Sequence, residues 1–164
     1  MKKKLTTVMF KGTPEQEEKL KAVIAKYQGV QGATMPVMQE AQEIYGYLPI
    51  EVQKMIAEGM GISLEEIYGI ASFYSQFKLN PNGEVAIAVC LGTACYVKGA
   101  GDIIARIEEK IGVKSGETSP DGKFSLEATR CIGACGLAPV LTINDEVYGR
   151  LKKEDVDTIL EKYL

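Results

Sequence analysis

The four cysteines of this chain fall into two short pairs, and this pairing constrains the fold more than any other feature of the sequence. The first pair encloses four residues, the second encloses three, and thirty-five residues separate them: Cys90 and Cys95, Cys131 and Cys135. Each pair directly follows a predicted strand, at 84–89 and 124–130, and a predicted helix at 101–111 connects these strands. Such a connection returns the chain beside its starting strand, so we expect both pairs at one edge of a sheet.

Four thiolates at one sheet edge match the ligand set of a binuclear iron–sulfur cluster, which uses two thiolates for each iron. Glycine and alanine fill both cysteine loops, which leaves space beside a metal and lets backbone N–H groups point at sulfur. The spacing also overlaps that of a structural zinc site with four thiolates, which stays open as an alternative. The sheet context favours iron–sulfur, because zinc knuckles commonly occur in small, loop-rich units. Simple burial of four thiols and a pair of disulfides are less favoured.

The absence of histidine restricts the chemistry further. It excludes nucleophilic triads that depend on histidine, zinc sites that use imidazole, and Rieske centres, which need two histidine ligands. Any metal in this protein is therefore expected to have thiolate or carboxylate ligands.

The overall charge and hydropathy argue against a nucleic-acid or membrane partner. The 164 residues carry a net charge of −3 and have a pI near 5.2, whereas both of those surfaces attract a basic excess. No stretch approaches the roughly twenty apolar residues that span a bilayer, and the basic start at Lys2, Lys3 and Lys4 lacks the apolar segment of a secretory signal. We therefore expect a cytoplasmic protein without direct membrane insertion. In the cytoplasm, clustered cysteines bind metal more often than they form disulfides.

An Asn-Pro-Asn-Gly turn divides the chain into a predicted helical domain, 1–82, and a predicted sheet domain, 83–164. Apolar residues recur at helical spacing through 14–78, and Thr13 and Ser63 are expected to cap the first and fourth helices. The four predicted helix starts are Pro14, Pro36, Pro49 and Ser63. The second domain has the predicted order β-α-β-β-β-α, and its first strand is expected to be buried on both faces. The predicted fold class is α+β, with a helical bundle before the sheet domain.

Two motifs in the sheet domain resemble those of the thioredoxin-like [2Fe–2S] ferredoxins. They are Cys90-Leu91-Gly92-Thr93-Ala94-Cys95 and Cys131-Ile132-Gly133-Ala134-Cys135-Gly136-Leu137-Ala138-Pro139. More narrowly, residues 14–164 resemble the 24-kDa-type subunit of NADH dehydrogenase (respiratory complex I), a type that occurs also in NAD(P)-linked, electron-bifurcating hydrogenases and in formate dehydrogenases. Two motifs in the helical domain contribute to this resemblance: Gly46-Tyr47-Leu48-Pro49 and Ile67-Tyr68-Gly69-Ile70-Ala71-Ser72-Phe73-Tyr74.

The resemblance implies that a thioredoxin-like domain follows the helical bundle and that one [2Fe–2S] cluster is held by Cys90, Cys95, Cys131 and Cys135. It also implies a flavoprotein partner that binds FMN and NAD(P)(H) and exchanges single electrons with the cluster, together with further iron–sulfur or hydrogenase subunits. The chain has neither a GxGxxG nor a GxxxxGK[ST] motif, so nucleotide binding is expected on the partner. The expected function is an electron-transfer subunit of an NAD(P)H-linked oxidoreductase, which is not catalytic alone. A zinc-binding assembly module and a free-standing [2Fe–2S] ferredoxin are the alternatives.

Several further residues have two interpretations each. Phe73, Tyr74 and Phe77 either contact the flavoprotein partner or pack in the helical core, and the core interpretation is favoured. Lys98 and Arg130 flank the cysteine loops, where they either stabilise a reduced cluster or face solvent or a partner. The proline that ends the second cysteine motif either sets the geometry of an edge strand or carries a cis peptide bond.

Overall fold

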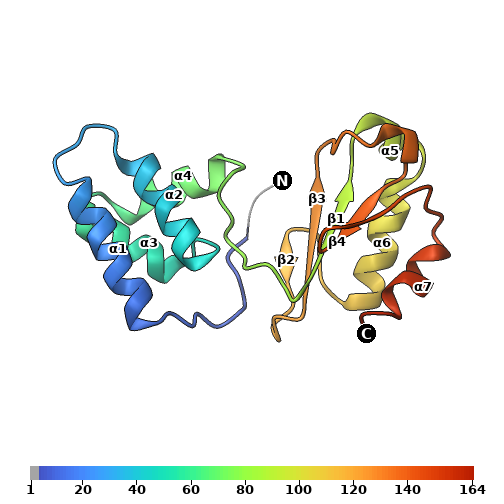
Figure 1. The fold of residues 1–164 in the computed structure, drawn as a ribbon, viewed down its shortest axis with the longest axis horizontal. Helices are drawn as coiled ribbons and strands as arrows, with labels where there is room; N and C mark the ends of the chain where they lie inside the picture. The colour runs from blue at the N-terminus through green and yellow to red at the C-terminus, as the bar shows by residue number, and fades with distance from the viewer. Residues whose placement is uncertain (1–3) are drawn as a thin grey trace. The chain divides into compact units, whose positions relative to one another are not determined.

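The computed structural model describes residues 4–164, which form two units (Figure 1). Residues 4–81 contain helices and loops and are called the helical unit, and residues 82–164 contain a five-stranded sheet and are called the sheet unit. Residues 1–3 lie outside the described part of the chain, and with them lie two lysines of the basic N-terminus and the start of the predicted domain 1–82. No helix within the described residues has both the length and the apolar character that a membrane crossing requires.

The helical unit is built from four α-helices, as the spacing of its apolar residues predicts. They are α1 (Pro14–Lys26), α2 (Thr34–Tyr45), α3 (Ile50–Met60) and α4 (Leu64–Phe73). The second helix begins two residues before the predicted Pro36, because proline fits anywhere in the first turn, where its missing N–H has no partner to lose.

Local capping chemistry sets the helix boundaries. Thr13 and Gln16 form a reciprocal capping box: the Gln16 N–H donates to Thr13 Oγ1 at 3.3 Å, and the Thr13 N–H donates to Gln16 Oε1 at 3.0 Å. Ser63 caps α4, as predicted, by accepting a backbone N–H from the first turn. Gly46 and Gly61 end α2 and α3 in the left-handed conformation, which glycine adopts without the steric cost of a Cβ atom.

The core of the helical unit is completed by Phe77, which lies beyond the end of α4. Phe77 is 1% exposed, so the core interpretation is correct for this residue. It was wrong for Phe73 and Tyr74, which are 82% and 43% exposed and form an edge-to-face pair. The Gln42 side chain holds the segment after α4 against α2, because it accepts the Lys78 N–H at 2.7 Å and donates to a neighbouring carbonyl at 2.8 Å. The helices contribute most of the other large buried side chains, among them Leu20, Val37, Met38, Val52, Ile56 and Ile67.

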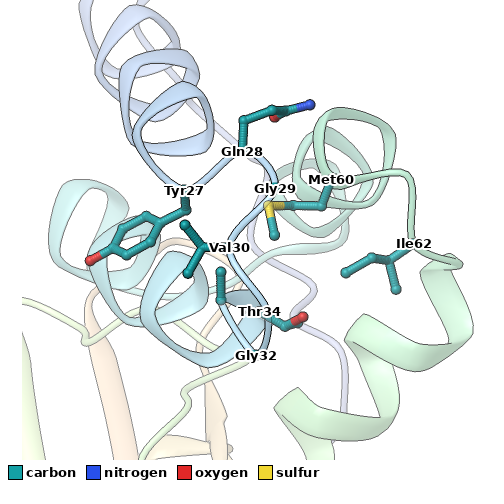
Figure 2. A pocket seen from close by; sticks show the side chains of 9 residues that line it. Tyr27, Gln28, Gly29, Val30, Gly32, Thr34, Met60 and Ile62 are labelled. Carbon is teal, nitrogen blue, oxygen red and sulfur yellow. The ribbon is translucent and has the colours of Figure 1, made fainter.

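A hollow of about 260 Å³ lies on the helical unit, beside the connection between α1 and α2 and the end of α3 (Figure 2). Its lining consists of apolar side chains, three polar residues and small residues that expose their backbone: Tyr27, Gln28, Gly29, Val30, Gly32, Ala33, Thr34, Met60 and Ile62. Because this lining includes no cysteine, carboxylate or basic side chain, the hollow is separate from the chemistry that the sequence indicates.

The sheet unit contains five strands in the order β2-β3-β1-β4-β5. They are β1 (Val85–Cys90), β2 (Glu117–Thr118), β3 (Phe124–Thr129), β4 (Leu141–Ile143) and β5 (Glu146–Tyr148). β1 and β3 are parallel, with Cys90 opposite Thr129, and the other neighbouring strands are antiparallel. A parallel pair is the expected result of a helical crossover, and it brings the ends of both strands to the same edge of the sheet.

Two helices, α6 (Ala100–Ile111) and α7 (Asp155–Leu160), lie on one side of this sheet (Figure 1). The face of α6 that carries Ile103 and Ile107 is buried with the strands in one apolar core. Ala86 and Ala88, which alternate with the buried side chains of β1, keep partial exposure. The expectation that the first strand is buried on both faces was therefore wrong, because the helices of this unit cover one face of the sheet.

The predicted order β-α-β-β-β-α is present, together with short elements that the sequence pattern did not predict. The helix α5 (Thr93–Val97) includes Cys95, the strand β2 pairs with β3, and a single 3-10 turn, η1 (Cys135–Leu137), begins at the last cysteine of the second pair. These elements have five, two and three residues, which is too short for a periodic apolar pattern to be visible.

Candidate metal centre

Both cysteine pairs lie at the edge of the sheet where the parallel strands β1 and β3 end. Cys90 is the last residue of β1, and Cys131 follows the end of β3 by two residues. The Leu91 N–H donates to the Thr129 carbonyl at 2.9 Å, which connects the first loop to the end of β3. The other two cysteines lie on the short helices α5 and η1, and Figure 1 shows α5 at this same end of the sheet.

The two cysteine loops approach each other closely at Gly92. A Cβ atom on this residue would lie 3.2 Å from the Cys131 Cβ, 3.3 Å from the Cys131 Cα and 3.5 Å from the Cys90 Sγ. Ordinary contacts of a Cβ atom are 3.4–4 Å, so a side chain here would push the second loop away. The sequence indicated that glycine leaves space beside a metal, and the structure shows that Gly92 also leaves space for the opposite loop.

The two pairs differ in their exposure to solvent. Cys90 and Cys95 are 3% and 2% exposed, whereas Cys131 and Cys135 are exposed. The helix α5 produces part of this difference, because it turns Cys95 into the core and its next two residues outward. A metal group held by all four sulfurs would consequently have one side against the protein core and one side toward solvent.

Backbone N–H groups of the loops point at the sulfur atoms. The Gly92 N–H donates to Cys90 Sγ, and the Gly133 N–H donates to Cys131 Sγ, each at 3.4 Å. Burial raises the pKa of Cys90, but N–H donation from Gly92 and Ile132, together with contacts to other thiols, outweighs burial and places this pKa below its ordinary value. These donors stabilise the thiolate, which is the form of cysteine that binds metal.

Contacts between sulfur atoms join the four cysteines into one group. The Sγ atoms of Cys131 and Cys135 are 3.9 Å apart, and the Cys90 thiol contacts those of Cys95 and Cys131. Burial raises the pKa of Cys95, and its contact with Cys90 acts in the same direction. The contact with Cys131 raises the pKa of Cys135. The neighbouring thiols therefore favour ionisation of Cys90 but oppose ionisation of Cys95 and Cys135, and a positive metal group among the sulfur atoms would relieve that opposition.

This donor set fits a binuclear iron–sulfur group. It consists of thiols alone, in two pairs, with backbone N–H groups directed at sulfur. The protein ligands of such clusters have the same features. Within residues 4–164, no three or more His, Cys, Asp or Glu side chains gather in the arrangement of a single-ion site.

A segment that the sequence did not single out supports the second cysteine loop from outside. The Arg150 N–H donates to the Leu137 carbonyl at 2.6 Å, and Arg150 is held at a φ of 57°, in the left-handed region. A Cβ on Gly149 would lie 2.7 Å from the Leu137 Cβ, so the glycine after β5 is the local signal of this close approach. The Ala138–Pro139 peptide bond is cis, which is the second of the two interpretations of that proline.

The family model described as thioredoxin-like [2Fe-2S] ferredoxin matches residues 20–164. The chain belongs to this family. It is 41% identical over 133 residues to the NADP-reducing hydrogenase subunit HndA of Solidesulfovibrio fructosivorans, covering 81% of this chain and 78% of that protein. It is 33% identical over 146 residues to an NADH-quinone oxidoreductase subunit of Rhizobium meliloti (strain 1021), covering 89% of this chain and 87% of the relative.

A crystal structure of an NAD+-reducing [NiFe]-hydrogenase in the H2-reduced state has a similar fold. The TM-score is 0.57 at 20% identity, and the match covers 80% of this chain and 22% of the hydrogenase chain. With the family match, this likeness confirms the predicted α+β class and the thioredoxin-like domain after a helical region. The predicted family is confirmed as well, and the relatives named above are subunits of oxidoreductases. The family supports an iron–sulfur cluster as the cofactor.

Proposed function

We propose that this chain is an electron-transfer subunit that carries one [2Fe–2S] cluster on four ligands: Cys90, Cys95, Cys131 and Cys135. The observation that carries the proposal is the meeting of both cysteine loops at the ends of two parallel strands, with N–H donors directed at the sulfur atoms. A bound [2Fe–2S] cluster supplies reversible one-electron oxidation and reduction.

The residues of the site have two opposing effects on the ease of reduction. The N–H groups of Gly92, Ile132 and Gly133 donate to sulfur, which stabilises additional negative charge and raises the reduction potential. Burial of Cys90 and Cys95 disfavours additional negative charge and lowers the potential. The exposed pair leaves one side of the site accessible to a redox partner.

The partner in this proposal is a flavoprotein subunit that binds FMN and NAD(P)(H), and it exchanges single electrons with this chain. Two observations support a multi-subunit complex: the named relatives are hydrogenase and NADH-quinone oxidoreductase subunits, and the sequence lacks both nucleotide-binding motifs. The higher identity to the hydrogenase subunit favours an NAD(P)-linked hydrogenase, with further iron–sulfur subunits.

The domain boundaries 1–82 and 83–164 and a cytoplasmic location are part of this proposal. The helical domain contributes partner-binding surface in it, because the exposed pair of Phe73 and Tyr74 lies outside the helical core.

Metal analysis and spectroscopy of the full chain, purified without oxygen, test the cluster. We expect two irons and two sulfides per chain, a brown colour, and an electron paramagnetic resonance signal that appears on reduction with dithionite. Replacing any one of the four cysteines with serine should reduce the amount of cluster or change its signal. A colourless protein with one tightly bound zinc would refute the proposal and support the zinc-binding assembly module.

Isolation of the native complex tests the partner. The chain, tagged in its own host, should be purified together with a protein that contains FMN. Recovery of the chain with its cluster as a monomer, with no flavoprotein in the same fraction, would instead support a free-standing ferredoxin.

A further inference from the structure

The basic side chains of the sheet unit differ in whether they are paired with acids. Three basic residues of α6 and the loop after it form ion pairs: Arg106 with Asp157 and Glu109, Lys110 with Asp157, and Lys114 with Glu108. Six other basic side chains of this unit are exposed and have no ion pair within residues 4–164: Lys98, Arg130, Arg150, Lys152, Lys153 and Lys162.

Three of these six residues lie beside the cysteine loops: Lys98, Arg130 and Arg150. Lys98 follows Cys95 by three residues, and Arg130 directly precedes Cys131. Arg150 is held against the end of the second loop by its N–H bond to the Leu137 carbonyl. The stretches 90–101 and 128–144 contain no acidic residue, although the chain as a whole has a net charge of −3. The two cysteine segments are therefore basic, although the protein as a whole is acidic.

Exposed apolar side chains occupy the same end of the sheet unit. Each of four such residues lies within two positions of a cysteine: Tyr96 (67% exposed), Val97 (79%), Ile132 (42%) and Leu137 (42%). The helix α5 causes part of this exposure, because burying Cys95 turns the next two side chains outward. Exposed apolar groups with charged neighbours are the usual composition of a protein–protein interface, in which tyrosine and arginine contribute most.

We propose that these seven residues, called the cysteine face, bind an acidic redox protein whose apolar contact area is surrounded by carboxylates. The inference rests on the proposed function, because the exposed Cys131 and Cys135 make this face the shortest route for an electron. Lys98, Arg130 and Arg150 attract the carboxylates during encounter, and the apolar side chains lose water on contact.

Electron transfer to a flavodoxin, a small acidic protein that contains FMN, provides the first test. The full chain is reduced with dithionite, freed of excess reductant and mixed with oxidised flavodoxin in a stopped-flow instrument. One electron leaves the cluster, and the flavin takes it up with one proton from water. We expect the rate to fall about tenfold between low and physiological ionic strength, because salt screens the attraction. A small uncharged quinone, which needs no docking, serves as the reference acceptor.

Two sets of charge reversals distinguish the effect of the cysteine face on the flavodoxin rate from the effect of the protein's net charge. Lys98→Glu, Arg130→Glu and Arg150→Glu together should slow the flavodoxin reaction about tenfold at low salt, relative to the quinone reaction. Lys110→Glu, Lys114→Glu and Lys123→Glu change the net charge by the same amount at the other end of the unit, and should change that ratio less than about twofold. Val97→Asp, on an exposed apolar side chain, should also slow the flavodoxin reaction.

Carbodiimide cross-linking gives a readout that does not depend on electron transfer. The reagent joins the Lys98 amine to a flavodoxin carboxylate as an amide, and the water lost is taken up as the urea. Mass spectrometry should find this cross-link at low salt and little at high salt, with Lys110, Lys114 and Lys123 not enriched.

The possible outcomes distinguish this inference from the proposed function. A wild-type rate that rises with salt, equal slowing by both sets of reversals, or the absence of a Lys98 cross-link would refute the cysteine face as the docking site. If the chain alone forms a dimer and the cysteine-face reversals dissociate that dimer, the face binds a second copy, and the inference of an acidic redox partner is refuted as well. A chain that takes no electron from dithionite and reduces no quinone would refute the proposed function itself.

Discussion

Gly92 provides a direct test of how the two cysteine loops are held together. The substitution Gly92→Ala adds one methyl group, and the backbone at Gly92, with φ −59° and ψ 157°, is one that alanine adopts readily. The new Cβ atom would lie 3.2 Å and 3.3 Å from the Cβ and Cα of Cys131. Because those atoms belong to or adjoin the backbone, the second loop must move to make room.

The expected cost follows from these distances. Inserting a methyl group into a packed site costs about 1–3 kcal/mol. Alanine also restricts the unfolded chain more than glycine does, which stabilises the fold by about 0.4–1 kcal/mol. The net expectation is a destabilisation of about 1 kcal/mol, which corresponds to roughly a fivefold change in an equilibrium constant. A displaced Cys131 should also alter the geometry of a bound cluster.

Gly136→Ala is the matched control, because Gly136 directly follows Cys135 and a Cβ atom there would have no neighbour within 4 Å. Its φ is not positive, so alanine is tolerated. Two measurements compare the variants: urea unfolding of the protein without metal, and loss of visible absorbance when the loaded protein is mixed with an iron chelator. Gly92→Ala should unfold at lower urea, lose its cluster about fivefold faster, and show shifted electron paramagnetic resonance g values. Gly136→Ala should be as stable as the wild type or up to about 1 kcal/mol more stable, and its cluster loss and resonance signal should match those of the wild type.

The reasoning fails if Gly92→Ala and Gly136→Ala behave alike. Equal stability with an unchanged resonance signal would mean that the loops have room for a side chain at Gly92, contrary to the distances above.

Three further predictions concern the folds of the two units. Phe77→Ala should lower the free energy of unfolding by about 3–5 kcal/mol, because it empties a buried site. Phe73→Ala should change this free energy by less than about 0.5 kcal/mol, because the side chain is exposed; equal effects in urea titrations would contradict this assignment. Gln42→Ala should cost about 0.5–1.5 kcal/mol, because it removes two hydrogen bonds to the backbone after α4, and amide hydrogen exchange should then be faster at the Lys78 N–H. Hydrogen bonds from Arg106 hold the pKa of Asp157 below its ordinary value, so this pair stabilises the fold above the ordinary aspartate pKa and the contribution is lost as pH falls through the lower, folded pKa. The difference in urea midpoint between wild type and Asp157→Asn should therefore be present at neutral pH and disappear in acid.

Local patterns in the sequence predicted much of the fold. Helical spacing of apolar residues located α1 to α4, and capping at Thr13 and Ser63 and glycines at Gly46 and Gly61 explain their ends. The pattern missed α5 and β2, because elements of five and two residues are too short to show a period. It also overestimated the burial of β1, since the alternation of apolar and small residues does not show which faces of the sheet helices will cover.

The sequence by itself determined the composition of the candidate site: four cysteines in two pairs after two strands, with no histidine in the chain. The tertiary structure decided which pair is buried, that Gly92 must accommodate Cys131, and that Arg150 lies beside the second loop. The reason is the range of the forces involved. Spacing and capping act between residues a few positions apart, whereas close contact at this site joins segments farther apart in the chain: Arg150 reaches back to Leu137, and Gly92 meets Cys131 because β1 and β3 pair.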